Sequence, residues 1–158
     1  MRKAALPPVV DENTEILILG TLPSDQSLAV GQYYANPNND FWNLLAAVLN
    51  QNLEGVPYET KIEILRAHGI GLWDAFRTGF RPGSLDKNIT DKELNDFEVL
   101  KEIAPKLFLV CFNGERAAEA EGSLRAHGCK TCHLPSSSSA NRKNQVKRLL
   151  KWTLAIQR

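Results

Sequence analysis

Two short and almost uninterrupted apolar runs constrain the fold of this chain more than any other feature. They are residues 15–19 (EILIL) and 107–112 (LFLVCF), and residues 70–73 (IGLW) and 131–134 (TCHL) form two shorter runs of the same kind. Such runs are typical of strands that helices cover on both faces. Segments of helical character separate them, which predicts right-handed crossovers. We therefore expect an α/β fold, a three-layer α/β/α sandwich around a central four-stranded parallel sheet.

The helical segments are bounded by residue types that are common at helix termini. The predicted helices are residues 41–49, 58–68, a segment that opens at 90–93, 115–127 and about 142–155. The third of them opens with TDKE, a capping box, and Pro105 bounds it. A chain of 158 residues has the usual size of one domain, so residues 1–158 are expected to form a single domain.

Charge is distributed unevenly, although the formal net charge is only +1. From residue 142 onward there are six basic residues and no aspartate or glutamate, whereas the rest of the chain has thirteen basic and eighteen acidic residues. A basic segment on an acidic body is consistent with contact to a polyanion, and it is equally consistent with a solvated helix face.

Cysteine usage and hydropathy exclude several classes of protein. Three cysteines are too few for a disulfide framework, and Cys129 and Cys132 form one CxxC without a second pair at zinc spacing. We therefore expect structural cysteines, no metal, no cofactor and a reducing, cytoplasmic location. No stretch approaches the ~20 apolar residues of a membrane span, and the N-terminus breaks at Pro7-Pro8 before a targeting segment forms. A monomer without membrane contact is expected.

The segment after the first predicted strand is the first candidate site, because ligands of parallel α/β folds bind beyond the carboxyl ends of the strands. Residues 20–39 have little regular pattern, and loops of that length are usually functional. Tyr33 and Tyr34 offer flat rings for stacking on a base or sugar, or for packing the loop on its scaffold. Asn39 either caps the next helix or positions a water molecule. The segment lacks the spacing of nucleotide-binding loops.

Four sequence blocks, in order along the chain, indicate a particular family more specifically than any of these single residues does. They read ILGTLPS and YYANPNNDFW at residues 18–24 and 33–42, GIGLWD and GSLD at 69–74 and 83–86, CFNG at 111–114, and HLPSSSSAN at 133–141. Together they resemble the motifs of the uracil-DNA glycosylase superfamily, with the hypoxanthine, or deaminated-purine, glycosylase family as the nearest branch. Ser24, Asn36 and Ser139 stand where that family usually has glycine, histidine and proline. The resemblance implies an α/β/α fold and cleavage of the N-glycosidic bond of a damaged base.

The resemblance also implies roles for individual residues. Asn39 and Asn113 match the asparagines that act in catalysis and in reading or activating the base. Gly20, Thr21, Leu22 and a stacking ring, Tyr34 or Phe41, are expected to bind the base. The residues expected to grip the DNA backbone are Ser136, Ser137, Ser138, Ser139, Asn141, Arg142 and Lys143, where hydroxyls and a basic helix start suit a phosphate.

The resulting hypothesis is a monofunctional DNA glycosylase that hydrolyses a deaminated base, hypoxanthine being favoured, after rotating it out of DNA. Leu22 stands where the mismatch-specific uracil branch has a catalytic asparagine, which disfavours strong action on uracil. Asp25 and Asp40 could assist the water, although Asp40 is also a candidate helix cap. The matched blocks contain no lysine for a Schiff base, so no strand cleavage is predicted. The alternatives are a mismatch-type uracil-DNA glycosylase and a non-catalytic nucleic-acid-binding relative.

Overall fold

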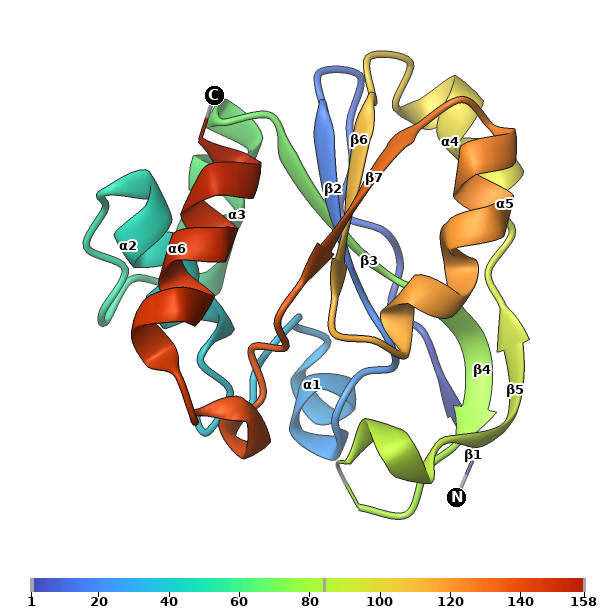
Figure 1. The fold of residues 1–158 in the computed structure, drawn as a ribbon, viewed down its shortest axis with the longest axis horizontal. Coiled ribbons are helices and arrows are strands. Elements are labelled where there is room, and N and C mark those ends of the chain that lie inside the picture. Colours follow the sequence, from blue (N-terminus) through green and yellow to red (C-terminus); the bar gives the residue numbers. More distant parts are fainter. Residues whose placement is uncertain (1, 84, 158) are drawn as a thin grey trace.

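A four-stranded parallel sheet forms the middle layer of the computed structural model, which describes residues 2–83 and 85–157 (Figure 1). Its strands are β2 (Ile16–Gly20), β3 (Ile70–Asp74), β6 (Leu109–Asn113) and β7 (Lys130–Leu134), in the spatial order β3-β2-β6-β7. All three neighbouring pairs are parallel. The predicted strands and the predicted central sheet are confirmed. Ser84 and Arg158 lie outside the described residues.

Helices cover both faces of this sheet. α2 (Phe41–Leu49), α3 (Tyr58–Ala67) and α6 (Gln145–Ile156) lie on one side, and α4 (Leu100–Ile103) and α5 (Glu121–Ala126) on the other (Figure 1). Alternate residues of β2 belong to the two cores: Ile16 and Ile18 pack on the first side, Leu17 and Leu19 on the second. The three-layer α/β/α architecture is confirmed, and α2 and α3 match the helices predicted at 41–49 and 58–68.

A second, antiparallel sheet was not predicted. It consists of β1 (Arg2–Ala4), β4 (Phe76–Phe80) and β5 (Thr90–Leu94) in the order β1-β4-β5. The capping-box prediction at residues 90–93 is therefore wrong. Every residue of β5 is exposed, so no apolar face marks it as a strand, and its backbone is held by pairing with β4, from Phe76↔Leu94 to Phe80↔Thr90. A non-local partner overrides a local capping signal here.

Two further predicted helices are shorter than expected. The segment 115–127 divides into a 3-10 turn, η3 (Ala117–Ala120), and α5. The last helix starts at Gln145 instead of about residue 142, because the Asn144 side chain caps it by accepting a hydrogen bond from the backbone of Lys147. A separate turn, η4 (Ser139–Asn141), precedes it. None of the helices within residues 2–83 and 85–157 is long and apolar enough to cross a membrane.

The carboxyl ends of the four strands form one polar edge. β2 and β3 end level at Gly20 and Asp74, and β6 and β7 end level at Asn113 and Leu134. The short helix α1 (Asp25–Val30) and the connection to α2 lie beyond this edge, as does the segment that follows β7 (Figure 1). Residues from distant parts of the sequence are thereby brought to one place.

Candidate active site

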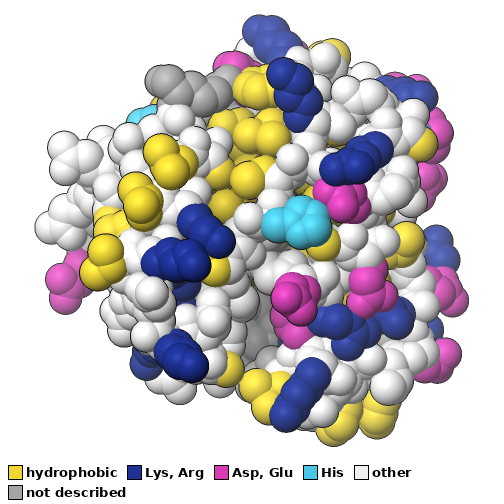
Figure 2. All heavy atoms as spheres, viewed as in Figure 1, with side chains coloured by type: hydrophobic (Ala, Val, Ile, Leu, Met, Phe, Trp, Pro, Cys, Tyr) yellow, Lys and Arg dark blue, Asp and Glu magenta, His cyan; other side chains and the backbone are white. Residues whose placement is uncertain are grey.

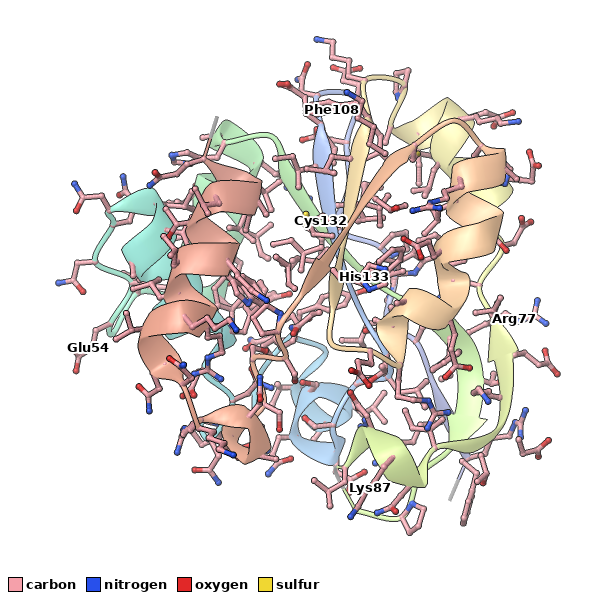
Figure 3. All side chains as sticks on the ribbon, viewed as in Figure 1. Glu54, Arg77, Lys87, Phe108, Cys132 and His133 are labelled. Carbon is pink, nitrogen blue, oxygen red and sulfur yellow. The ribbon has the colours of Figure 1, made fainter. Side chains whose placement is uncertain are left out.

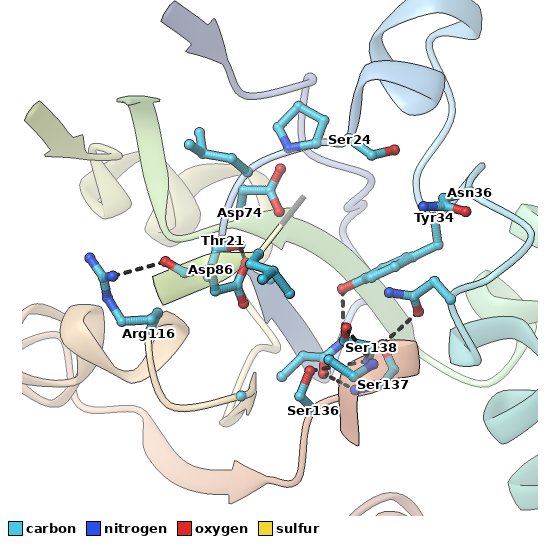
Figure 4. A pocket seen from close by; sticks show the side chains of 18 of the residues that line it. Thr21, Ser24, Tyr34, Asn36, Asp74, Asp86, Arg116, Ser136, Ser137 and Ser138 are labelled. Atoms are coloured by element: carbon cyan, nitrogen blue, oxygen red, sulfur yellow. Dashed lines mark hydrogen bonds between the residues drawn. The ribbon is translucent and has the colours of Figure 1, made fainter. Parts of the chain in front are cut away.

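A cavity of about 400 Å³ opens at the carboxyl edge of the sheet (Figure 4). Its walls come from the turn after β2, the loop before α2, the ends of β3 and β6, and the serine-rich segment after β7. Tyr34 and Asn36 lie on one side of it, and Asp86 and Arg116 lie on the other. A volume in this range is typical of small-molecule sites. This is the position at which parallel α/β folds bind ligands.

Asn39 and Asn113 are brought together by one buried serine. The Ser137 hydroxyl donates to Asn39 Oδ1 at 2.7 Å and accepts from Asn113 Nδ2 at 2.9 Å, and the Ser137 backbone N–H donates to Asn113 Oδ1 at 2.9 Å. Ser137 is only 1% exposed. Its assignment to the DNA backbone is therefore not supported by its place in the structure, where it holds the two amides in fixed orientations.

The Asn39 side chain is bound to the start of α2. Its Oδ1 also accepts from the backbone N–H of Phe41 at 3.0 Å, at the start of α2. Both lone pairs of this oxygen are thus occupied, by Phe41 and by Ser137, and the amide nitrogen is the group that Asn39 can offer to the cavity. Asn39 is accordingly suited to donate to the oxygen of a water or a sugar, and not to accept a proton.

The two adjacent tyrosines lie in different surroundings. Tyr33 is buried and donates to the carbonyls of Leu6 and Pro7, so it packs the loop onto its scaffold. The Tyr34 ring lines the cavity, stacks on Phe41 at a centroid distance of 3.8 Å, and accepts from Asn113 Nδ2 at 3.1 Å through its hydroxyl. Phe41 is fully buried, so it supports the stacking ring instead of meeting a base itself. Burial raises the pKa of the Tyr34 phenol, which stays protonated.

The serine-rich segment is held from the side of α6. Arg148, 4% exposed, donates to the carbonyls of Ser136 and Asn141, and its Nη2 donates to Asp40 Oδ2 at 2.6 Å. Arg142 donates to both oxygens of Asp40 at 2.8 Å. The hydrogen bond from Arg142 is the main reason that the pKa of Asp40 falls to about 2.

Neither of the two carboxylates proposed to assist the water is available for it. Asp40 is bound by two arginines, and its side chain makes no cap hydrogen bond to α2. Asp25 is paired with Lys3 at 3.1 Å. Asp40 thus occupies the N-cap position of α2 as predicted, but its side chain ties the serine-rich segment to the start of α2 instead of capping the helix.

Sequence reasoning missed most of the opposite wall. There Asp86 accepts hydrogen bonds from the Thr21 hydroxyl at 2.8 Å and from Arg81 at 3.2 Å, and Arg116 donates to the Asp86 carbonyl at 2.9 Å. Leu22 is buried in the second core, and its carbonyl accepts from Arg81. All three residues of the turn expected to bind the base, Gly20, Thr21 and Leu22, line the cavity.

Asp74 is the most unusual group that was missed. It is 4% exposed and lines the cavity, and its Oδ2 is buried without a hydrogen-bond partner among the residues that the structure describes. Burial raises the pKa of this carboxyl to about 7; the charge of Arg81 opposes the rise and that of Asp86 adds to it. Asp74 directly follows the strand predicted at residues 70–73, at the ligand-binding edge, so this position was the available signal.

Comparison with known proteins agrees with the fold and the site described above. The family model described as the uracil DNA glycosylase superfamily matches residues 7–157. The chain belongs to the uracil-DNA glycosylase superfamily. A superfamily relative from Methanosarcina acetivorans, named hypoxanthine DNA glycosylase, is 53% identical over 152 residues and covers 96% of both chains. A protein of the same name from Methanosarcina barkeri is 48% identical over 158 residues, 100% of both chains.

A solved structure matches this superfamily member over nearly its whole length. It is a solution NMR structure from Methanosarcina acetivorans, described as a candidate uracil DNA glycosylase, with 51% identity and a TM-score of 0.90. The match covers 99% of this chain and 98% of the other. The resemblance inferred from the four sequence blocks is thereby confirmed at the level of family and fold.

Five exposed basic residues of the superfamily member lie in three settings. Lys147 and Lys151 are exposed on α6, which also exposes Val146, Leu150 and Leu154, and they do not line the cavity. Figure 2 shows basic and apolar side chains together on the left, where α6 lies in Figure 1. Arg142 and Lys143 lie in the connection before α6, not within a helix. Lys87 is exposed and lines the cavity, at the end of the molecule opposite to Phe108 (Figure 3). Cations beside the opening are placed to meet a phosphate backbone.

Proposed function

We propose that this superfamily member is a monofunctional DNA glycosylase that hydrolyses the N-glycosidic bond of a deaminated base, hypoxanthine, rotated out of DNA. The single observation that carries the proposal is the pair Asn39 and Asn113, fixed by Ser137 at a cavity of base-like size beyond the strand ends. Relatives about half identical over the full chain bear the name hypoxanthine DNA glycosylase. We also propose that it acts as a monomer, in the cytoplasm, where its free thiols would persist.

The first step is the capture of an everted nucleotide. Rotation out of the stack costs a few kcal/mol, and it costs least at a mismatch or lesion. The Tyr34 face opposite to Phe41 would stack on the base, which is worth ~1–3 kcal/mol. Asn113 would accept a hydrogen bond from the base edge with the remaining lone pair of its Oδ1, because Ser137 and Tyr34 take both hydrogens of its amide nitrogen. The hydroxyls of Ser136, Ser138 and Ser139, with Arg142 and Lys143, would hold the flanking phosphates.

The second step is hydrolysis through an oxocarbenium-like sugar. Asn39 would donate its amide hydrogen to the oxygen of the attacking water and so orient it toward C1′. The C1′–N bond breaks with its electron pair moving to the base, the water oxygen bonds to C1′, and the proton of the water leaves to solvent. Lys87 is exposed, without the burial that makes a lysine amine an effective nucleophile, so no covalent lyase step is proposed.

The decisive experiment is a panel of DNA duplexes and single strands with one hypoxanthine, uracil, xanthine or undamaged base. Abasic-site formation is scored by alkaline cleavage. The proposal requires hypoxanthine release well above release of uracil and of undamaged bases. Uracil release in excess of hypoxanthine would instead indicate a mismatch-type uracil enzyme. Binding without release from any substrate would indicate a non-catalytic relative. Trapping of a covalent adduct with borohydride would contradict the monofunctional assignment.

Asn39→Ala tests the central amide of the site. We expect it to abolish most base release and to leave DNA affinity within about twofold, because the water would lose its donor while the phosphate contacts remain. Asn38→Ala is the matched control: Asn38 belongs to the same loop but does not line the cavity. Base release by Asn39→Ala equal to that of the control would contradict the role of Asn39.

A further inference from the structure

Asp74 and Asn113 stand on either side of the glycine that forms the cavity floor. Asp74 is paired in register with Gly20, and β6 lies on the other side of β2. Side chains alternate along a strand, so Asp74, Gly20 and Asn113 share one face of the sheet with the core residues two positions before them. Those core residues are Leu72, Ile18 and Cys111.

The separation of these strands suits a flat, bicyclic base. Neighbouring strands lie ~4.8 Å apart, so the ends of β3 and β6 are on the order of 10 Å apart, with only glycine between them. A Cβ atom at Gly20 would lie 2.9 Å from Asp74 Oδ1 and 2.9 Å from the Tyr34 hydroxyl oxygen. A side chain at position 20 would collide with both atoms, so glycine is what allows the carboxyl group and the phenol to converge at the cavity.

The structure gives Asp74 no partner that would use its second oxygen. Oδ2 is buried and makes no hydrogen bond within residues 2–83 and 85–157. The arginine that faces this wall, Arg81, donates instead to Asp86 and to the carbonyls of Leu22 and Pro23. A buried polar atom without a partner is costly unless a ligand supplies one. Since Asp74 also lines the cavity, the missing partner would be an atom of the base.

We infer that Asp74, as a carboxylic acid, is the catalytic residue that protonates a ring nitrogen of the departing purine. The inference rests on the proposed function. As the C1′–N9 bond breaks, its electron pair moves into the purine ring, and the Asp74 proton moves to a ring nitrogen, so the base leaves neutral. Water adds to C1′ and releases its proton to solvent, and a proton from solvent restores the carboxyl group. Asn113 would hold the opposite edge of the base during this transfer.

The electrostatic surroundings of Asp74 agree with this role. Burial raises the pKa of its carboxyl to about 7, the value at which an acid can both hold and transfer a proton near neutral pH. The charged groups that act on Asp74 are Arg81, which opposes this rise, and Asp86, which adds to it. The neighbouring Tyr34 phenol stays protonated, because burial raises its pKa. The rate of base release should therefore fall as the pH rises above about 7.

The test compares single-turnover release of hypoxanthine between pH 5.5 and 9 by the wild type, Asp74→Asn and Asp86→Asn. Wild-type rates should fall about tenfold per pH unit above pH 7. Asp74→Asn keeps the shape and the hydrogen-bonding capacity of the neutral acid but cannot transfer its proton. It should release hypoxanthine roughly a hundred- to ten-thousand-fold more slowly, with no alkaline limb. Asp86→Asn should retain that limb and shift it to lower pH, because the charge that raises the pKa of Asp74 is removed.

Each result bears on one proposal only. If the wild type releases no hypoxanthine, the proposed function fails. If it does, and Asp74→Asn keeps the wild-type rate or the wild-type alkaline limb, the inference about Asp74 is overturned. Thermal unfolding and affinity for DNA establish that Asp74→Asn is folded. Should it not fold, Asp86→Asn decides: an alkaline limb at the wild-type pH overturns the inference, and a shift to lower pH supports it.

Discussion

Asp74 should make the stability of the folded protein fall between about pH 4 and pH 7, whatever base the protein cleaves. In the unfolded chain its carboxyl ionises near the usual pKa of 3.8, whereas in the folded protein burial raises the pKa to about 7. Between these values the folded state binds one proton that the unfolded state has lost. Stability therefore decreases as the pH rises through this window, and it levels off above the folded pKa.

The size of the effect follows from the two pKa values. Each tenfold change in proton affinity corresponds to about 1.4 kcal/mol, so ionisation of Asp74 should lower the free energy of unfolding by roughly 4 kcal/mol in total. Natural domains unfold at a cost of only ~5–15 kcal/mol. A single buried carboxyl would thus remove a large share of the stability of this protein.

Urea denaturation of the wild type and of Asp74→Asn, at half-unit steps from pH 4 to pH 8.5, measures this directly. The two proteins share every other titrating group, so the difference between their unfolding free energies isolates Asp74. We expect the wild type to lose about 1.4 kcal/mol per pH unit relative to the variant up to pH 7, and nothing further above it. A difference that stays constant over the whole range would refute the reasoning, because Asp74 would then ionise alike in both states.

Three further substitutions test other parts of the site. Ser137→Ala removes the hydroxyl that joins the two amides, so it should lower the free energy of unfolding by about 1–3 kcal/mol and slow base release. Ser139→Ala, at an exposed position, should change the free energy of unfolding by less than ~0.5 kcal/mol. Equal effects of the two substitutions on the free energy of unfolding would contradict the bridging role of Ser137. Gly20→Ala should abolish base release and spare DNA affinity, since its methyl group would fill the space beside Asp74, and full activity would contradict a base seated there. Lys143→Ala should weaken binding to all DNA sequences alike and reduce the salt slope by ~1, and an unchanged slope in a binding titration would exclude a phosphate contact.

The sequence by itself determined those strands whose own residues show the apolar pattern of a buried element. β2 and β6 were predictable because nearly every residue in them is apolar, as burial on both faces of a sheet requires. Asn39 and Asn113 were found because they belong to sequence blocks shared with a family. By contrast, the charged residues of β5 show no apolar periodicity, and only pairing with β4 makes them a strand.

Only the tertiary structure decided which of several side chains of the same type, such as the four serines, takes part in the site. Four consecutive serines are indistinguishable in sequence, yet only Ser137 is buried between the two amides. Asp74 is one aspartate among many until folding removes its carboxyl from water, and its raised pKa belongs to that environment and not to the residue. The amino-acid sequence thus determines which chemical groups are available and where strands end, whereas burial and non-local contacts determine their protonation and their orientation. The physical reason is that desolvation and hydrogen bonding depend on neighbours that are distant in the chain.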